Sequence, residues 1–209
     1  MTRLALPSLY AIVDPLDTGR NTEDLAVALL AGGARLLQLR LKDASSRELL
    51  AAARLLRALT ARAGALLLVN DRPDVALAAH TDGVHLGQDD LPVAAARTVL
   101  GPGAVVGVST HDVAQARAAA ADGADYVGVG PVFATATKRG ALPPRGLELV
   151  RAVRDVIELP LVAIGGITPE TAVDVRAAGA DAVAMIGALV RARDVAAMVR
   201  DTIARLGNA

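Results

Sequence analysis

Short apolar runs alternate with longer stretches in which apolar and polar residues recur at helical spacing, and this alternation continues along the chain. Each apolar run is brief, as is typical of parallel strands that are covered on both faces. We therefore expect strands at residues 9–13, 36–41, 66–69, 83–86, 105–108, 126–129, 161–164 and 182–186. The amphipathic stretches between them predict helices near residues 22–31, 46–63, 73–79, 92–99, 112–121, 147–156, 169–177 and 189–205.

The ends of these stretches carry residue types that are expected at helix boundaries. Asn21 or Thr22 can cap the first helix, and Thr168 is followed by Pro169 at the first position of a later one. Glycine recurs where a helix gives way to a strand, in the segments 31–34, 122–125 and 178–181. Glycine at such a joint can take the left-handed conformation that ends a helix. The recurrence favours a fold that is built from one βα unit used many times.

Eight strands that alternate with eight helices predict a single-domain (β/α)8 TIM barrel spanning residues 1–209. One domain of about 200–250 residues is normal for this class of fold. No change of composition and no linker rich in proline, glycine or serine divides the chain. An open, doubly wound sheet is the structural alternative.

The composition removes several classes of function. The 209 residues include 22 basic and 22 acidic side chains, and only three residues are aromatic. This balance argues against a nucleic acid or an anionic membrane as partner, and no aromatic platform is available on which bases could stack. The longest apolar runs, such as residues 63–69, are far shorter than the ~18–20 residues of a membrane span. The absence of cysteine rules out disulfides and thiolate metal sites, which suits the cytoplasm.

In a barrel of this kind the chemistry lies at the carboxyl ends of the strands, and the polar residues of this chain gather there. Gln38, Arg40 and Lys42 alternate along one strand end, so their side chains share a face. The positive charges of Arg40 and Lys42 at the strand end favour binding of an anion at the mouth of the barrel. The alternative is that the strand end is exposed to solvent, where charged side chains need no ligand. Lys138 adds a third cation, and with Arg40 and Lys42 it can hold a diphosphate. These two lysines are the only ones among 22 basic residues, a bias that a GC-rich genome explains.

Two carboxylates follow neighbouring strands, Asp71 after the strand at 66–69 and Asp90 after the strand at 83–86. Mg²⁺ prefers oxygen ligands and is usually held by one or two carboxylates plus substrate phosphates, so the pair predicts Mg²⁺ as cofactor. Helix capping is the alternative for both residues. Asp89 would take the place of Asp90 if the strand register were shifted by one.

Glycines end the last two strands, at residues 165–166 and at Gly187. Barrels often hold a phosphate with the backbone N–H groups of these two loops and a helix N-terminus, although a tight turn also explains the glycine pair. The histidines are weaker signals. His80 suits the surface or packing, His85 suits a hydrogen-bonded interior position, and His111 suits either a substrate contact or a helix cap.

Taken in this order, the residues resemble the thiamine-phosphate synthase (thiamine-phosphate pyrophosphorylase) family, from Leu9 to Leu189. The resemblance rests on QLRLKD at 38–43, VNDR at 69–72, GVHLGQDD at 83–90, GVSTH at 107–111, GPVFATATK at 130–138 and AIGGI at 163–167. It implies that hydroxymethylpyrimidine diphosphate is coupled with thiazole phosphate, giving thiamine phosphate and pyrophosphate.

The resemblance also implies a ligand for each matching residue. Gln38 and Ser109 would hold the aminopyrimidine, and Asp71 and Asp90 would hold Mg²⁺. The diphosphate would be bound by Arg40, Lys42, Asn70 and Lys138, of which the three cations are also the candidate catalytic residues. The thiazole phosphate would be bound by Thr135, Thr137, Gly166, Ile186 and Gly187. Gly187 is a departure, because the family often has serine there.

This reaction needs no covalent nucleophile. Loss of pyrophosphate from an electron-rich pyrimidine methylene leaves a delocalised cation, so Mg²⁺ and fixed cations can lower the barrier by stabilising the leaving group. The alternatives are a thiazole tautomerase of the same fold, a Schiff-base aldolase that uses Lys42 or Lys138, and a binding module without activity. The expected partners are the two small-molecule substrates, with no nucleic acid and no membrane, and a homo-oligomer is compatible with the sequence.

Overall fold

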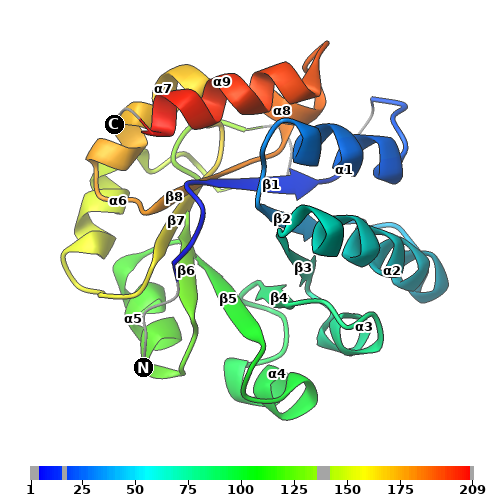
Figure 1. Cartoon of the computed structure of the whole chain (residues 1–209). Helices are drawn as coiled ribbons and strands as arrows, with labels where there is room; N and C mark the ends of the chain where they lie inside the picture. Colours follow the sequence, from blue (N-terminus) through cyan, green and yellow to red (C-terminus); the bar gives the residue numbers. More distant parts are fainter. Residues whose placement is uncertain (1–4, 16–17, 136–141, 208–209) are drawn as a thin grey trace.

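The computed structural model describes residues 5–15, 18–135 and 142–207, and within them eight parallel strands close into a barrel (Figure 1). The strands are β1 (Leu9–Val13), β2 (Leu36–Leu39), β3 (Leu66–Asn70), β4 (Gly83–Leu86), β5 (Val105–Thr110), β6 (Tyr126–Val129), β7 (Leu161–Ile164) and β8 (Ala182–Met185). They follow one another around the barrel in sequence order, and β8 closes it by pairing with β1. The single-domain (β/α)8 barrel is therefore confirmed, and the open sheet is wrong.

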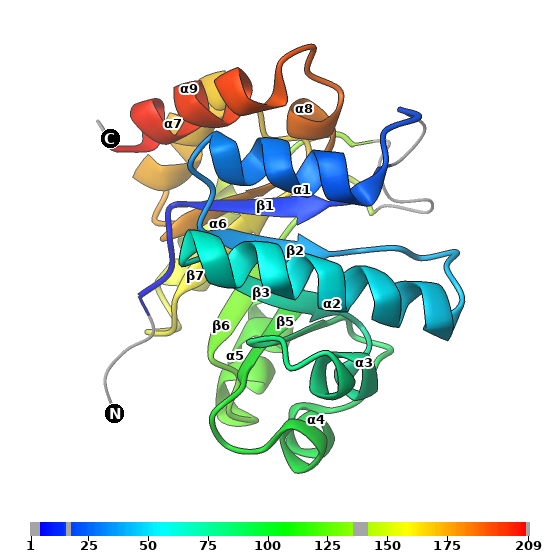
Figure 2. The same ribbon diagram turned by 45° about the vertical axis from the view of Figure 1, so that its right-hand side comes forward.

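Helices cover the outside of the barrel, and Figure 2 shows α1 (Thr22–Ala31) and α2 (Ser46–Ala63) side by side in front of β1 and β2. The other helices are α3 (Pro73–Ala78), α4 (Val93–Leu100), α5 (Val113–Ala121), α6 (Gly146–Arg154), α7 (Pro169–Ala177), α8 (Gly187–Val190) and α9 (Val195–Gly207). Within the described residues, no helix has the length and apolar character that a membrane crossing requires.

The helix boundaries follow the chemistry expected of them. The side chain of Asn21 accepts a hydrogen bond from the backbone N–H of Asp24 at 2.7 Å, and Thr168 caps α7 ahead of Pro169. The glycines of the three repeated joints all have positive φ, with 104° at Gly33, 86° at Gly123 and 109° at Gly179. The left-handed conformation that we expected at the helix ends is therefore confirmed.

The last helical stretch differs from the prediction. We expected one helix over residues 189–205, but the structure has the short α8 and a separate α9. Asp194 starts the second helix, because its Oδ1 accepts a hydrogen bond from the backbone N–H of Ala197 at 2.9 Å. A capping side chain of this kind favours a new helix start over continuation. The periodicity of the apolar residues crosses this break and conceals it.

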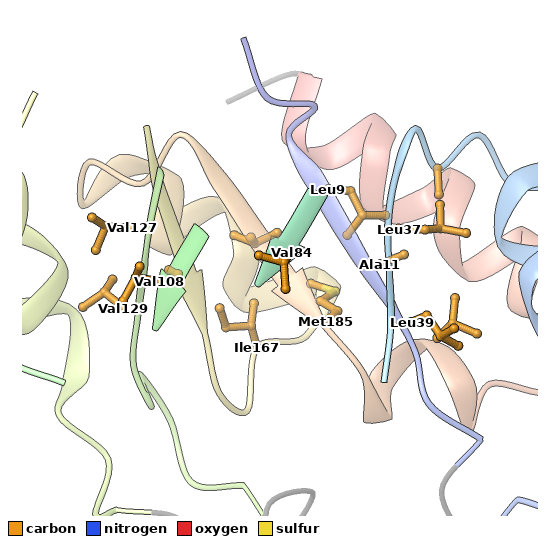
Figure 3. Packing of buried hydrophobic residues seen from close by; sticks show 14 of the residues in the cluster. Leu9, Ala11, Leu37, Leu39, Val84, Val108, Val127, Val129, Ile167 and Met185 are labelled. Atoms are coloured by element: carbon orange, nitrogen blue, oxygen red, sulfur yellow. The ribbon is translucent and has the colours of Figure 1, made fainter. Parts of the chain in front are cut away.

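Alternate residues of the strands form two apolar layers, as the two-residue period of a strand requires. The outer layer packs the strands against the helices and includes Leu37, Val84 and Met185, which Figure 3 labels. The inner layer fills the barrel and includes the buried side chains of Tyr10 and Tyr126. The interior of the barrel is thus a packed core and not a channel.

The amino ends of the strands are joined by a repeated contact, which we call the amino-end clamps. Asp82, Asp125 and Asp181 directly precede β4, β6 and β8. Their carboxylates accept backbone N–H groups at the starts of β3, β5 and β7, from Leu67 at 2.8 Å, Val106 at 2.7 Å and Leu161 at 2.8 Å. Each carboxylate also pairs with a helix arginine, namely Arg57 at 3.6 Å, Arg97 at 2.6 Å and Arg154 at 2.9 Å.

Candidate active site at the carboxyl ends of the strands

Arg40 is fixed at the rim by its neighbours on β1. It follows β2 directly, and its backbone N–H donates to the carbonyl oxygen of Val13 at 3.0 Å. Its guanidinium donates to the carboxylate of Asp14, and the two side chains are only 15% and 12% exposed. The sequence interpretation missed Asp14, although its position directly after the first strand was a signal. An ion pair shielded in this way holds the guanidinium in one place at the mouth of the barrel.

Lys42 reaches in the other direction, toward β3. Its Nζ lies 2.5 Å from Oδ2 of Asp71, which follows Asn70, the last residue of that strand. Asp71 has a φ of 63°, and its backbone N–H donates to the carbonyl oxygen of His85 at 2.8 Å. An aspartate in the left-handed region is uncommon, and such residues often occur where function fixes the backbone. Arg40 and Lys42 thus flank the end of β2 on its two sides.

Asp90 meets Asp71 from the loop after β4. Its Oδ2 accepts the backbone N–H of Gly87 at 2.6 Å. Burial, and then the hydrogen-bonded and negatively charged Asp71, raise the pKa of the Asp90 carboxyl, whereas the Gly87 N–H and the charge of Lys42 act to lower it. Asp89 is exposed, and it is Asp90 that lies against Asp71. The alternative in which Asp89 takes the place of Asp90 is therefore not what the structure has.

Neither aspartate caps the helix that follows it. The N-cap positions of α3 and α4 are Arg72 and Pro92, and no side chain forms a capping bond at either. The capping explanation of Asp71 and Asp90 is therefore wrong. Two carboxylates in contact repel each other unless a proton or a cation lies between them, and their oxygen ligands suit Mg²⁺. In the described ranges no group of three or more histidine, cysteine, aspartate or glutamate residues could hold a metal, so an ion here needs further oxygen ligands from substrate or water.

Gln38 and Ser109 are tied into a hydrogen-bonded cluster inside the barrel. Gln38 is 3% exposed, and its Nε2 donates to the hydroxyl of Tyr10 at 2.8 Å. The Ser109 Oγ lies 2.8 Å from Nε2 of His85, whose Nδ1 lies 2.7 Å from the hydroxyl of Tyr126. The hydrogen-bonded interior position expected for His85 is confirmed. The sequence did not predict hydrogen bonds for the two tyrosine hydroxyls, because an aromatic residue within a strand is usually part of the hydrophobic core.

His111 lies at the rim but is held by the fold. Its Nδ1 lies 2.6 Å from the carbonyl oxygen of Gly130, and its backbone N–H donates to Oε1 of Gln115 at 2.8 Å. Asp112 caps α5, so the expectation that His111 caps this helix is wrong. His80 is exposed and lies between α3 and β4, at the amino end of that strand and not at its carboxyl end.

The ends of β7 and β8 supply backbone groups instead of side chains. Gly165 and Gly166 have φ values of 105° and 63°, and a Cβ at Gly166 would lie 2.4 Å from the carbonyl oxygen of Ala134. Close packing therefore requires the glycine pair, and it also leaves Gly166 exposed at the rim. After Ile186, the short helix α8 begins at Gly187 without a side-chain cap. A glycine loop after the seventh strand beside a short helix after the eighth is the usual phosphate site of such barrels.

The remaining predicted residues lie in the loop after β6. Thr135 is half-buried there, near the end of the described part of this loop. Thr137 and Lys138 lie outside the described residues. The structure thus pairs Arg40 with Asp14 and Lys42 with Asp71, places Asp90 against Asp71, and connects Gln38 to Ser109 only through the side chains of Tyr10, Tyr126 and His85.

The family profile, the curated relatives and one solved structure above 30% identity indicate the same family. The sequence profile described as "Thiamine monophosphate synthase" matches residues 9–189. The chain is 50% identical over 193 residues to "Thiamine-phosphate synthase" of Chloroflexus aurantiacus, covering 92% of this chain and 89% of that protein. It is equally similar to the protein of the same name from Moorella thermoacetica, with 50% identity that covers 92% of each chain. Among solved structures, "Thiamine phosphate pyrophosphorylase" from Pyrococcus furiosus superposes with a TM-score of 0.89 at 35% identity, covering 97% of this chain and 96% of that one.

Proposed function

The chain belongs to the thiamine monophosphate synthase family and is an enzyme of that family, and we propose how the residues at its carboxyl rim carry out the reaction. The enzyme condenses hydroxymethylpyrimidine diphosphate with thiazole phosphate and releases thiamine phosphate and pyrophosphate. The observation that carries the proposal is the contact of Asp71 with Asp90 beside Lys42, because it joins a metal-binding pair to a cation for the diphosphate.

The diphosphate would lie between Arg40 and Lys42. Arg40 is anchored on Asp14, so its guanidinium can face the anion in a fixed orientation. Lys42 has a side chain that is 49% exposed, so it can move from Asp71 to a phosphate oxygen. Asn70 at the end of β3 can donate a hydrogen bond to the same group. Lys138 would complete this site from outside the described residues.

Mg²⁺ fits the pair of carboxylates. Asp71 and Asp90 offer oxygen ligands alone, and the pKa of Asp90 is raised first by burial and then by the neighbouring Asp71, whose negative charge a bound cation would offset. When bound there, Mg²⁺ would neutralise charge on the departing pyrophosphate. The task of the two aspartates is to hold the ion beside Lys42, where the leaving group develops its charge.

The two rings would be bound by different parts of the rim. Gln38 and Ser109 would hold the aminopyrimidine above the barrel interior. Thr135, Thr137, Gly166, Ile186 and Gly187 would hold the thiazole phosphate. Gly187 replaces the serine that is frequent in the family, so the backbone N–H of this residue would serve in place of a hydroxyl.

The bond from the pyrimidine methylene carbon to the diphosphate oxygen would break first, and the electron pair leaves with pyrophosphate. The electron-rich ring delocalises the positive charge, and the thiazole nitrogen then forms the new bond to the methylene carbon. Positioning and charge stabilisation suffice for this course, so we infer that no side chain acts as a nucleophile or as an essential base. The substrates are small molecules, and a cytoplasmic location is the corresponding proposal.

The test is an assay of the purified chain with both substrates, with Mg²⁺ and with the metal removed by a chelator. We expect thiamine phosphate and pyrophosphate in equal amounts, with turnover lost on chelation and restored by added Mg²⁺. A parallel assay for tautomerisation of the thiazole carboxylate serves as the control. Turnover that is unaffected by chelation would contradict the metal proposal.

A further inference from the structure

A continuous line of hydrogen bonds crosses the barrel interior from β2 to β5. It runs from Gln38 Nε2 to the Tyr10 hydroxyl at 2.8 Å and on to the Tyr126 hydroxyl at 3.1 Å. From there it reaches His85 Nδ1 at 2.7 Å, and His85 Nε2 meets Ser109 Oγ at 2.8 Å. The line therefore joins the two residues that we assign to the aminopyrimidine through three residues that have no assigned role.

Glycines on β5 and β6 leave space for the side chains that form these hydrogen bonds. His85, Gly107 and Tyr126 lie opposite one another on β4, β5 and β6, so the glycine leaves a gap between the two rings. The rings of His85 and Tyr126 stack across the gap, with centroids 5.6 Å apart. A Cβ at Gly107 would lie 1.9 Å from Cζ of Tyr126, and one at Gly128 would lie 3.3 Å from Cε1 of His85. Glycine within a strand is unfavourable unless something must approach closely, and here the approaching groups are these rings.

With the Gln38 amide oriented so that Nε2 faces Tyr10, the hydrogen bonds have one direction that satisfies every group. The Gln38 amide nitrogen can only donate, so the Tyr10 oxygen accepts. Tyr10 is 1% exposed, and a buried hydroxyl hydrogen needs an acceptor, which the Tyr126 oxygen provides. Tyr126 in turn donates to His85 Nδ1. In this amide orientation, the opposite direction would leave the buried hydroxyl hydrogen of Tyr10 without an acceptor.

This direction fixes the tautomer of His85. With Nδ1 as acceptor, the neutral imidazole carries its hydrogen on Nε2 and donates it to Ser109 Oγ. Burial raises the pKa of both tyrosines above the ordinary value, so both hydroxyls stay protonated and remain donors. Among the described residues no further hydrogen bond reaches the Ser109 hydroxyl or the Gln38 Oε1.

We propose that Tyr10, Tyr126 and His85 form a positioning relay that presents the Ser109 hydroxyl as a donor and the Gln38 oxygen as an acceptor to the pyrimidine. An aminopyrimidine edge carries the complementary pattern, a ring nitrogen that accepts beside an amino group that donates. An oxo group in place of the amino group would face the Gln38 oxygen with a second acceptor. The relay thus selects amino- over oxopyrimidines, an inference that rests on the proposed function of Gln38 and Ser109.

The first test measures the tautomer of His85 in the ligand-free protein, so its result does not depend on enzymatic activity. The chain has three histidines, so the side-chain ¹⁵N signals of His85 can be assigned by substitution. We expect the neutral tautomer with hydrogen on Nε2 in the wild type. In Tyr126→Phe, Nδ1 loses its donor, and we expect the signals to shift toward a mixture of tautomers, with those of His80 and His111 unchanged.

The second test is kinetic. Tyr126→Phe should raise the KM for pyrimidine diphosphate about 3- to 10-fold, which is the range expected for the loss of one orienting hydrogen bond, and leave the KM for thiazole phosphate unchanged. Thr110→Val is the matched control, because it removes a buried hydroxyl of β5 that donates to the Gly128 carbonyl at 3.0 Å and takes no part in the relay. His85→Gln keeps an Nε2 donor and should bind pyrimidine better than His85→Leu.

The outcomes of these tests distinguish failure of the proposed relay from failure of the proposed synthase function. An unchanged tautomer and unchanged kinetics in Tyr126→Phe, in an active enzyme, would overturn the relay. Equal increases of both KM values in Tyr126→Phe and Thr110→Val would also overturn it, since they would indicate a general loss of packing. A wild type without synthase activity but with the Nε2–H tautomer would support the direction of the relay and overturn its assignment to an aminopyrimidine.

Discussion

The two rims of the barrel use the same residue type in opposite ways. At the amino rim, each aspartate of the amino-end clamps accepts a strand N–H and pairs with an arginine, so its charge is matched. At the carboxyl rim, Asp71 and Asp90 meet each other, and the pKa of Asp90 is raised by burial and by that contact. Matched charges hold strands in place, whereas a like-charged pair is costly to folding and is retained for what it binds. Whether an aspartate faces an arginine or another aspartate therefore distinguishes the structural aspartates of this barrel from those proposed to bind a ligand.

Asp90→Asn should have the largest effect on activity. It removes one charge from the proposed metal site, and we expect kcat/KM to fall about 10²–10³-fold, as for loss of a main charge-stabilising group. Steady-state kinetics across a range of Mg²⁺ concentrations measure the change. Asp89→Asn is the matched control, because that side chain is exposed beside the site and should leave the rate unaltered.

The same substitution should slightly stabilise the metal-free fold. Neutralising one member of the pair removes repulsion, and solvent screening limits the gain to a few tenths of a kcal/mol. Denaturant unfolding with chelator present measures this free energy. A clear loss of stability in Asp90→Asn would contradict the contrast between the rims.

Asp125→Asn should have the opposite profile. Its carboxylate accepts the N–H of Val106 at 2.7 Å and the Arg97 guanidinium at 2.6 Å, so the variant leaves a half-buried arginine unmatched. We expect the free energy of unfolding to fall by about 1–3 kcal/mol, with kcat/KM per folded molecule unchanged. Asp122→Asn, in the same joint but exposed, is the control and should change neither quantity.

Asp14 lies at the carboxyl rim but is paired with an arginine, as the aspartates of the amino-end clamps are, so we expect its loss to affect both stability and activity. Asp14→Asn removes the charge that holds Arg40 in a largely shielded position. We expect a loss of about 1–2 kcal/mol in the free energy of unfolding and a fall of roughly 3- to 10-fold in kcat/KM for pyrimidine diphosphate. Asp24→Asn on the exposed start of α1 provides the comparison. An effect on stability alone would limit Asp14 to a structural role.

The sequence predicted the barrel and its rim well, because both follow from local patterns. The predicted strands ended at or within two residues of the observed strands, and the polar residues after β2, β3, β4, β5 and β6 were identified in order, whereas Asp14 after β1 was not. Side-chain partners across the barrel were not predictable, since Tyr10 and Tyr126 are 116 residues apart and meet only after closure. The Asp14–Arg40 pair joins the ends of the neighbouring strands β1 and β2, and it was missed because the position of Asp14 after β1 did not identify a partner 26 residues away. The break before α9 was missed because a cap at Asp194 interrupts the backbone without interrupting the apolar period.

Lys42→Arg should have the smallest effect, and it tests why lysine stands at this rim in a chain that otherwise prefers arginine. Lys42 holds Asp71 through one nitrogen atom and can release it to a metal ion. Arginine would grip the carboxylate with two parallel N–H groups and compete with Mg²⁺. We expect a roughly 2- to 5-fold higher Mg²⁺ concentration for half-maximal rate, at a similar rate at saturation. Arg205→Lys, at an exposed pair with Asp201 on α9, is the control. An unchanged Mg²⁺ requirement in Lys42→Arg would mean that only the charge matters at this position, and the excess of arginine elsewhere would then say nothing about the site.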